Sequence, residues 1–360
     1  MRELIENAAN WLAEPTRYTI WTTLLLVLVL KFRKIAISPV LFGAMSVGMV
    51  AFFVFAWPDP DFNTIITKPD NVPIIILLAT VLFFSWLSLR RAVINDERIK
   101  KGEPTLEGEL SKQKVFVWPD LVYTELICLV LFTALLLIWS IEIGAPIEEP
   151  ASQARTPNPS KAPWYFLGLQ ELLVYFDPWI AGVLLPSFII VGLMAVPYLD
   201  TNPKGNGYYT FDERPFAISF FWVGFLLLWV SLVIMGTFLR GPNWSFFGPF
   251  EYWDPHKLEP AVNVNLSEYV WIKWLGKPRP DSILLREAPG LLSIGFYFVV
   301  LPPILGMTLF RKMAANLGTA RFMVMMHLFL WFVIIPIKML LRWTVNLKYF
   351  VAIPEFFFNI

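Results

Sequence analysis

The stretch LVYTELICLVLFTALLLIWSI, at residues 121–141, decides the fold class of this chain. Glu125 is its single charged residue. A bilayer core of about 30 Å takes roughly 20 helical residues to cross, so the run is long enough to span it. A surface helix of a soluble domain keeps one polar face toward water, which this run does not have. The stretch therefore predicts a membrane-spanning helix.

Six further apolar runs of this kind lie on both sides of the first. They occupy residues 35–57, 72–89, 179–199, 216–239, 290–310 and 322–337. The shorter run 18–30 is expected to be an eighth span, because the charged loops then alternate correctly. Hydrophobic residues make up 57% of the chain, against roughly 45–50% in soluble domains. We therefore predict an all-α integral membrane protein with about eight transmembrane helices.

Composition also excludes several functions. The net charge of +1 gives no reason to expect nucleic acid as a partner. Cys128 is the only cysteine, so the chain cannot form an internal disulfide, a CxxCH haem-attachment site or a cysteine-ligated iron–sulfur cluster. The lipid bilayer is therefore the first partner that the sequence predicts.

Lysine and arginine gather in four parts of the chain, and cytoplasmic loops carry such an excess. These parts are residues 31–34, residues 90–114, Arg214, and residues 311–321. One orientation places all four in the cytoplasm and puts loops 58–71, 144–178 and 240–289 on the positive side. We predict a multi-pass protein of a prokaryotic cytoplasmic (inner) membrane.

Charge and apolar patterning divide the chain into three parts. Residues 1–117 form an N-terminal extension with a short interfacial helix and two or three spans. Residues 118–240 form the central module. Residues 241–360 hold a positive-side loop, two further spans and a C-terminal tail. The charged linker 90–114 is the clearest boundary between modules.

The positive-side loop contains an amphipathic segment, APWYFLGLQELL, at residues 162–173. An apolar helix in a connecting loop is expected to lie against the membrane or a partner. Trp164 and Tyr165 at its start are aromatics typical of an interface. The segment predicts an interfacial helix that roofs a pocket at the bilayer edge, where a lipid-soluble substrate could enter sideways.

Ala162-Pro163-Trp164-Tyr165 resembles the Pro-Glu-Trp-Tyr motif in the C-terminal half of cytochrome b and in the separate subunit IV of split versions. The resemblance covers roughly residues 118–239, and LRGPNW at 239–244 is similar to bacterial menaquinol–cytochrome c reductases. Its other supporting segments are GVLL at 182–185, VPYLD at 196–200 and RPFA at 214–217.

The resemblance implies a subunit of a quinol–cytochrome c oxidoreductase complex, in which the loop helix forms one wall of the positive-side quinol-oxidation site. It implies menaquinone as the quinone, with b haems and a Rieske [2Fe–2S] cluster on partner subunits. Those partners would be a haem-bearing N-terminal-half cytochrome b, the Rieske protein and a c-type, conceivably multihaem, cytochrome. The implied quinol-binding residues are Pro163, Trp164, Tyr165, Phe166 and Leu169.

One departure from the motif concerns proton transfer. Pro163 stands at the glutamate position and can neither accept nor relay a proton. Glu171, about two turns further along, is the nearest carboxylate in the loop helix, and a buried carboxylate suits general-base work. We expect Glu171 to take part of that role; the alternative is a surface glutamate paired with a partner subunit. Asp177 is expected to cap the helix that follows Pro178.

Haem ligation is restricted by the histidine count. The family holds two b haems with four histidines on its N-terminal half, whereas this chain has only His256 and His327. His327 lies inside an apolar run, where an ionisable residue is a functional candidate by default. A polar contact to a neighbouring helix or a partner is nevertheless expected for it rather than axial ligation, so this chain should hold no metal and the haems should lie on another polypeptide.

Two rival functions remain open. The chain could be a non-catalytic membrane anchor of another respiratory redox complex, which the Pro163 substitution keeps in consideration. It could also be a transporter, although Glu125 and His327 are the only ionisable candidates within the clear spans. Ion and substrate pathways usually need more such groups.

Overall fold

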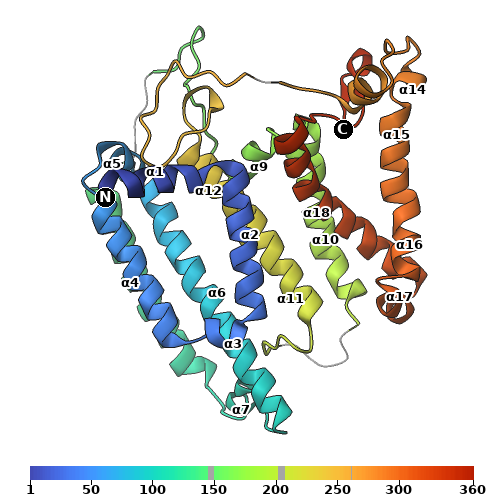
Figure 1. Ribbon diagram of the computed structural model, residues 1–360. Helices are drawn as coiled ribbons and strands as arrows, with labels where there is room; N and C mark the ends of the chain where they lie inside the picture. Colours follow the sequence, from blue (N-terminus) through green and yellow to red (C-terminus); the bar gives the residue numbers. More distant parts are fainter. Residues whose placement is uncertain (145–149, 202–206, 261) are drawn as a thin grey trace. The chain divides into compact units, whose positions relative to one another are not determined.

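A computed structural model describes residues 1–144, 150–201, 207–260 and 262–360 (Figure 1). Nearly all of the regular structure is helical, as the sequence predicts. Among the described residues, β1 (Ala352–Ile353) and β2 (Phe358–Asn359) form one short antiparallel pair.

The chain folds into two compact units, which are described separately. Unit 1 comprises Met1–Ser160, Asn206–Leu227 and Thr237–His256. Unit 2 comprises Lys161–Gly205, Leu228–Gly236 and Lys257–Ile360.

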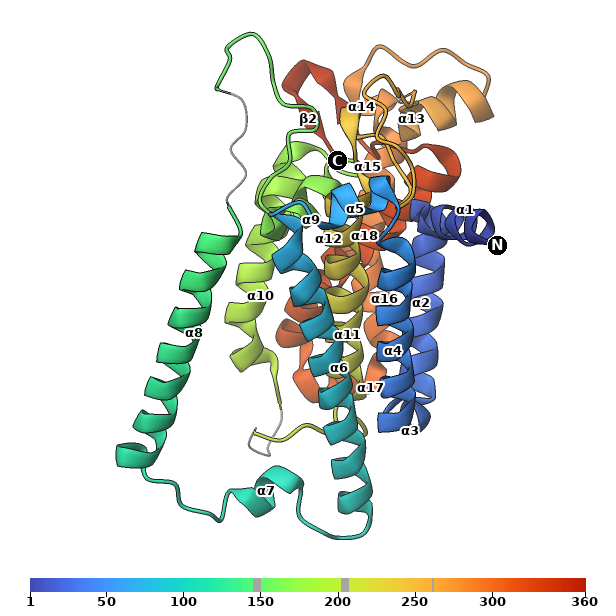
Figure 2. The same cartoon turned by 90° about the vertical axis from the view of Figure 1, so that its left-hand side faces the viewer.

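Unit 1 is built on long helices that run side by side. Figures 1 and 2 show α2, α4 and α6 in this arrangement, with α1 lying across one end of them. The helices of unit 1 are α1 (Arg2–Ala13), α2 (Pro15–Lys31), α3 (Arg33–Ala36), α4 (Pro39–Ala56), α5 (Pro60–Ile66), α6 (Asn71–Lys100), α7 (Leu106–Leu110), α8 (Val122–Glu142) and α11 (Pro215–Trp222), with a 3₁₀ turn at Pro242–Trp244.

Local sequence sets where these helices begin. The Asp59 side chain accepts a hydrogen bond from the Phe62 N–H at 2.9 Å, and Pro60 follows as the first helical residue of α5. The same pairing of a side-chain cap with a proline starts α2 at Glu14 and α4 at Ser38. A cap satisfies an N–H that has no partner inside the helix, and proline lacks an N–H that would need one.

The core of unit 1 joins its N-terminal helices to α11. Leu89 and Ala92 of α6 are buried against Ile218 and Trp222 of α11. Partly buried residues of α2 and α3 pack on the same cluster. The N-terminal helices are therefore packed against part of the predicted central module.

A buried carboxylate at the end of α6 receives main-chain donors from the segment before α11. The Asp96 side chain is 5% exposed and accepts hydrogen bonds from the N–H groups of Phe211 and Asp212 at 3.1–3.3 Å. Its neighbour Asn95 donates to the Tyr209 carbonyl oxygen at 3.0 Å. These bonds fix the segment before α11 to the end of α6.

Ion pairs reinforce the same junction. Asp212 contacts Arg33 and Lys100, each at 2.6 Å. The hydrogen bond from Lys100, together with the nearby positive charges, holds the pKa of the Asp212 carboxyl below its usual value. Three of the four regions predicted to be cytoplasmic thus meet at one end of unit 1, as expected if all of them lie on one side of the membrane.

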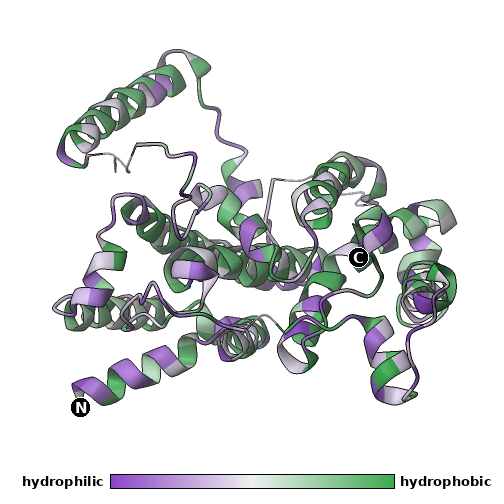
Figure 3. Ribbon diagram, turned by 90° about the horizontal axis from the view of Figure 1, so that it is seen from above, coloured by the Kyte–Doolittle hydropathy of each residue, from purple (hydrophilic) through white to green (hydrophobic). Residues whose placement is uncertain are grey.

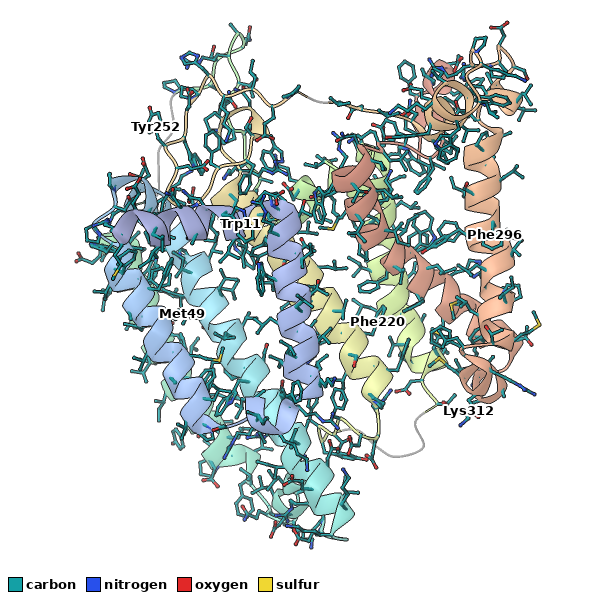
Figure 4. The ribbon with its side chains drawn as sticks, in the orientation of Figure 1. Trp11, Met49, Phe220, Tyr252, Phe296 and Lys312 are labelled. Atoms are coloured by element: carbon teal, nitrogen blue, oxygen red, sulfur yellow. The ribbon has the colours of Figure 1, made fainter. Side chains whose placement is uncertain are left out.

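At the other end of unit 1, α1 is joined to the loop that follows Leu239. Asn10 of α1 accepts a hydrogen bond from the Phe250 N–H at 2.9 Å, and the Phe250 ring stacks on Phe62 of α5 at 5.3 Å. Polar and apolar residues alternate along α1 (Figure 3), and Trp11 on it is 54% exposed (Figure 4). This pattern fits the expected interfacial helix.

Unit 2 contains the loop helix, three spanning elements and the tail. Its α-helices are α9 (Trp164–Leu172), α10 (Leu185–Leu199), α12 (Ser231–Ile234), α13 (Leu266–Glu268), α14 (Ile283–Arg286), α15 (Ala288–Gly295), α16 (Leu301–Met307), α17 (Arg311–Leu317) and α18 (Thr319–Val345). Wider π-helical turns occur in both units at Val117–Leu121, Ile180–Leu184, Val223–Val230, Met235–Leu239, Tyr269–Trp274 and Phe296–Val300, and a 3₁₀ turn lies at Pro354–Phe356.

The segment formed by α15 and α16 packs against α18 through an aromatic-rich core. Phe322, Met326 and Leu330 of α18 are buried, and the Tyr297 hydroxyl donates to the Leu330 carbonyl oxygen at 2.8 Å. Phe298 stacks near Trp331 with ring centroids 4.7 Å apart. These contacts make α15 to α18 a helical hairpin that supports the tail.

Seven helices among the described residues are long and apolar enough to cross a membrane, and they correspond to the seven long apolar runs. They are Pro39–Ala56, Asn71–Lys100, Val117–Glu142, Ile180–Leu199, Pro215–Leu239, Ala288–Met307 and Thr319–Val345.

The proposed eighth span, at residues 18–30, falls within α2. This helix has 17 residues and is about 25 Å long at the usual helical rise, so it is shorter than a comfortable span. The eighth span therefore stays a prediction, whereas the multi-pass membrane fold is confirmed.

The Asp96 junction yields a test of how unit 1 is held together. Asp96→Ala would leave the N–H groups of Phe211 and Asp212 without their acceptor, at about 1–3 kcal/mol for each buried group. We expect the midpoint of thermal unfolding in mild detergent to fall by several degrees. Glu97→Ala is the matched control, because Glu97 is half-exposed and pairs with Lys34 at the surface, where such a pair contributes under about 1 kcal/mol. Equal midpoints for the two variants would contradict this account.

Candidate functional site

The loop helix predicted from APWYFLGLQELL is α9 (Trp164–Leu172). Pro163 immediately precedes the helix and its carbonyl oxygen accepts a hydrogen bond from the Phe166 N–H at 2.8 Å. The Gln170 side chain reaches back to accept from the Ala162 N–H at 2.8 Å. The residues that start the motif are therefore held against their own helix.

The two faces of α9 differ sharply in exposure. Leu167, Gly168, Glu171 and Leu172 are buried. Three aromatic residues at the start of the helix are exposed instead: Trp164 by 38%, Tyr165 by 55% and Phe166 by 51%. Leu169, the remaining predicted quinol-binding residue, is half-buried.

The buried face of α9 packs on the segment Leu228–Gly236 of a spanning helix. A Cβ atom added to Gly236 would lie 3.2 Å from the Leu167 carbonyl oxygen, so the two backbones approach closely. A Cβ atom added to Gly168 would in turn lie 3.5–3.6 Å from the side chains of Val233 and Trp229. Gly236 and Trp229 both lie in π-helical turns, and such turns are frequent at functional sites.

The exposed aromatic residues of α9 form a cluster with one residue of the spanning helix. The Tyr165 ring lies 5.7 Å from Trp164, 5.4 Å from Phe166 and 5.5 Å from Trp229, measured between centroids. Aromatic pairs at these separations attract one another edge to face. We call Trp164, Tyr165, Phe166 and Trp229 the aromatic wall.

Sequence reasoning found three members of the aromatic wall and missed Trp229. Trp229 lies within an apolar run rich in large residues, with no motif around it. Nothing in that pattern distinguishes a wall residue from one that faces lipid, so the sequence carries no signal for it.

Glu171 lies apart from Tyr165 and Phe166 on the helix. Its side chain is fully buried on the face that packs against Leu228–Gly236. Successive helical residues turn by about 100°, so Glu171 points well over 90° away from Tyr165, six residues earlier. Glu171 is therefore not exposed at the helix surface, so the alternative of a surface glutamate is wrong. The role of Glu171 in proton transfer stays a prediction.

His327 lies in α18 and is half-buried. Its Nδ1 atom is 2.7 Å from the Met323 carbonyl oxygen, one turn earlier in the same helix. This contact lies within α18, whereas the contact expected from the sequence was to a neighbouring helix or a partner. The described residues contain no group of three or more histidine, cysteine or acidic side chains that could hold a metal.

The C-terminal end of α9 is held by residues far along the chain. Lys348 Nζ donates to the carbonyl oxygens of Leu173 and Val174, each at 3.0 Å. The Asp177 carboxylate accepts from the Asn359 side-chain amide at 2.9 Å. Asp177 was expected to cap the next helix, and it directly precedes the first helical residue, Pro178, with its main-chain carbonyl oxygen accepting from the Ile180 and Ala181 N–H groups at 3.0 Å. The Asp177 carboxylate itself accepts a hydrogen bond from the tail.

The fold and this site define a polytopic membrane protein with an aromatic-faced helix in a loop between two of its spans. A family model described as "Cytochrome b(C-terminal)/b6/petD" matches residues 150–250. This part of the chain is therefore similar to the C-terminal family of cytochrome b and subunit IV. No solved structure matches the chain.

The match covers the part of the chain that carries the site. It includes α9, α10 and the spanning helix Pro215–Leu239, and therefore the whole aromatic wall. Proteins of this family work in quinol-oxidising complexes, and the chain is a membrane subunit of that general type. Helices α1 to α8 and α13 to α18 lie outside the match.

The close approach at Gly236 can be tested by filling it. Gly236→Val would push against the Leu167 backbone, and overpacking of this kind costs about 1–3 kcal/mol. We expect hydrogen exchange at the amides of α9 to accelerate by about tenfold, which corresponds to about 1.4 kcal/mol. Gly192→Val in α10 is the control, because nothing lies within 4 Å of a Cβ there. Unchanged exchange in Gly236→Val would show that α9 does not depend on this contact.

Proposed function

We propose that this chain is the quinol-site subunit of a cytochrome bc-type complex and that α9 forms one wall of the positive-side quinol-oxidation site. The aromatic wall is the observation that carries this proposal. It presents three exposed aromatic rings on a helix within a loop between membrane spans. A quinol ring is flat and apolar, so it packs well against such a surface, and its lipid tail can remain in the bilayer.

Each part of α9 contributes differently to the proposed site. Tyr165 and Phe166, with Trp164 beside them, would contact the quinol ring and exclude water. Pro163 and Leu169 would border this surface at its start and side. The Tyr165 hydroxyl can donate a hydrogen bond to a quinol oxygen or accept one from a quinol hydroxyl. The buried face of α9 would hold these residues at a fixed place relative to the spanning helix.

Electron acceptors must come from partner subunits. The chain has two histidines, of which His327 lies in a spanning helix and His256 lies in a loop. Its residues therefore do not fit a bis-histidine haem site. We propose a haem-bearing cytochrome b subunit, a Rieske iron–sulfur protein and a c-type cytochrome as partners. We further propose menaquinol as the substrate and a prokaryotic cytoplasmic membrane as the location.

Proton release is the step of this proposal that differs most from what the family motif would provide. Pro163 offers no acidic group where the family motif has one. Glu171 is the fully buried carboxylate of α9. Because it faces the spanning helix, it can accept a quinol proton only if the quinol headgroup reaches that packing face or a water connects them. We propose Glu171 as the proton acceptor on this condition.

The composition of the native complex tests the proposed function. We expect purification in mild detergent to recover the chain with a Rieske protein and with a b-haem polypeptide, detected by subunit identification and a reduced-minus-oxidised spectrum. A complex with neither would mean that the fold persists without quinol chemistry. The chain would then be a membrane anchor of another redox complex, the alternative that the Pro163 substitution keeps open. Substrate uptake by proteoliposomes would instead point to a transporter.

A separate variant tests the proton acceptor. Glu171→Gln keeps the shape of the side chain but cannot bind the proton, and loss of a general base typically costs about 10²-fold or more in rate. We expect quinol oxidation by the purified complex to slow by about that factor, with the pH dependence of kcat altered. Glu142→Gln, an exposed glutamate at the end of α8, serves as the control. Unchanged turnover would remove Glu171 from the mechanism and leave the wall proposal standing.

A further inference from the structure

The C-terminal tail, residues 346–360, lies outside the family match and forms extensive bonds within unit 2. We call it the strap. It follows α18, turns through the β1–β2 pair and contacts three other parts of the unit. The first is the end of α9 with the turn after it, and the second is the start of α15. The third is the segment at residues 264–266, whose Val264 carbonyl oxygen accepts a hydrogen bond from the Lys348 N–H at 2.9 Å.

Lys348 makes the most direct contact between the strap and α9. Its ammonium group donates to two carbonyl oxygens: that of Leu173, the C-cap residue of α9, and that of Val174, the next residue in the turn. The last carbonyls of a helix have no partner inside it and carry partial negative charge. A lysine at this place therefore satisfies two acceptors and complements the helix dipole.

The turn between α9 and α10 is joined to the strap by four further contacts. Asp177 accepts a hydrogen bond from Asn359 at 2.9 Å and a longer one from the Tyr349 hydroxyl at 3.4 Å. Trp179 donates from its indole nitrogen to the Asn359 carbonyl oxygen at 2.9 Å. The same indole stacks on Phe358 with ring centroids 5.5 Å apart.

The far side of the strap is fixed to the start of α15. Arg286 binds the Glu355 carboxylate through two nitrogens, at 3.0 and 2.9 Å. The buried Glu287 carboxylate accepts from the Ala352 N–H at 3.1 Å. Gly290 allows the strap to approach, because a Cβ atom there would lie 2.0 Å from the Phe350 carbonyl oxygen.

Lys338 of α18 binds the main chain of Lys348. It is 1% exposed and donates to the Lys348 carbonyl oxygen. Its ammonium group also lies 4.9 Å from the Phe350 ring centroid and 5.7 Å from that of Phe176. The Lys348 backbone is therefore fixed, so its side chain reaches the end of α9 from a defined origin.

We propose that the strap positions α9, and that Lys348 is the positioning residue that sets where the aromatic wall meets quinol. This inference rests on the proposed function for its effect on quinol, but its structural part is independent of it. A strap that only stabilised the fold would lower the melting temperature without changing the affinity for quinol selectively.

The charge of Lys348 provides a readout specific to positioning. Burial, reinforced by the positive charge of Arg342, lowers the pKa of Lys348 to about 8, and Asp177 opposes this shift. Lys338 and Tyr349 are the other titratable groups beside it. Above pH 8 the amine is neutral and its two bonds weaken, because charge-assisted hydrogen bonds are about twice as strong as neutral ones. The KM for quinol should therefore rise as the pH increases through about 8.

Lys348→Met tests the positioning role in the purified complex, with a short-chain naphthoquinol as substrate. Two charge-assisted hydrogen bonds are lost, so we expect KM to rise by about tenfold, with a smaller change in kcat. Hydrogen exchange across residues 170–176 should increase. Lys348→Arg should restore both properties and abolish the rise of KM above pH 8, because a guanidinium stays charged there.

Lys312→Met provides the matched control, since Lys312 is an exposed lysine on α17, before α18 begins (Figure 4). It should leave KM and exchange in α9 unchanged. Exchange in Lys348→Met equal to that in the control would overturn the proposal, as would an arginine variant no better than methionine. If Lys348→Met does not assemble, Asp177→Asn tests the strap while keeping Lys348. This variant should raise hydrogen exchange at residues 173–179. No increase in that exchange would also overturn the proposal.

The exchange measurement separates this inference from the proposed function. A complex that does not oxidise quinol would refute the function, yet faster exchange of α9 in Lys348→Met would still establish the strap. Normal quinol oxidation with unchanged KM in Lys348→Met would refute the strap and leave the function intact.

Discussion

A helix of nine residues does not hold its shape alone, because isolated helices shorter than about 12–15 residues are marginal in water. Helix α9 is of this length and carries the residues on which the proposed site depends. Its position must come from packing on one side and from bonded ends. The close approach of Leu167 to Gly236 provides the packing, and Lys348 bonds the last carbonyls. The exposed aromatic face is free to contact a substrate because the rest of α9 is engaged.

The sequence was sufficient to predict the spans because a bilayer imposes one strong local rule. Each run of about 20 apolar residues must become a helix, since lipid offers no partner for an open backbone. Helix α9 was predictable for a similar reason, from its amphipathic residues and its place between two spans. Trp164 and Tyr165 were found through the motif that they share with a known family, and Phe166 through the wider resemblance to it.

The remaining features depend on contacts between residues far apart in the sequence. Lys348 bonds Leu173, 175 positions earlier, and nothing near Lys348 indicates this pairing. Gly236 and Trp229 gain their roles only once α9 lies against them. Phe358 in the tail stacks on Trp179 beside the end of α9, a contact that the residues around Phe358 do not indicate. Local pattern reveals how a segment folds, whereas its partners are decided by the three-dimensional packing of the unit.

The junction at Asp96 has a consequence for how the chain is made. Asp96 bonds the N–H groups of Phe211 and Asp212, which are 115 and 116 residues later in the sequence. Chains fold from the N-terminus as they are synthesised. The end of α6 is therefore completed before its partners exist, and α8 and α10 must enter the membrane in the interval. During that time Asp96 is an acidic group at the bilayer surface with no bond to the segment it will hold. Unit 1 is thus completed in two stages. The early helices insert first, and the segment before α11 binds the end of α6 later.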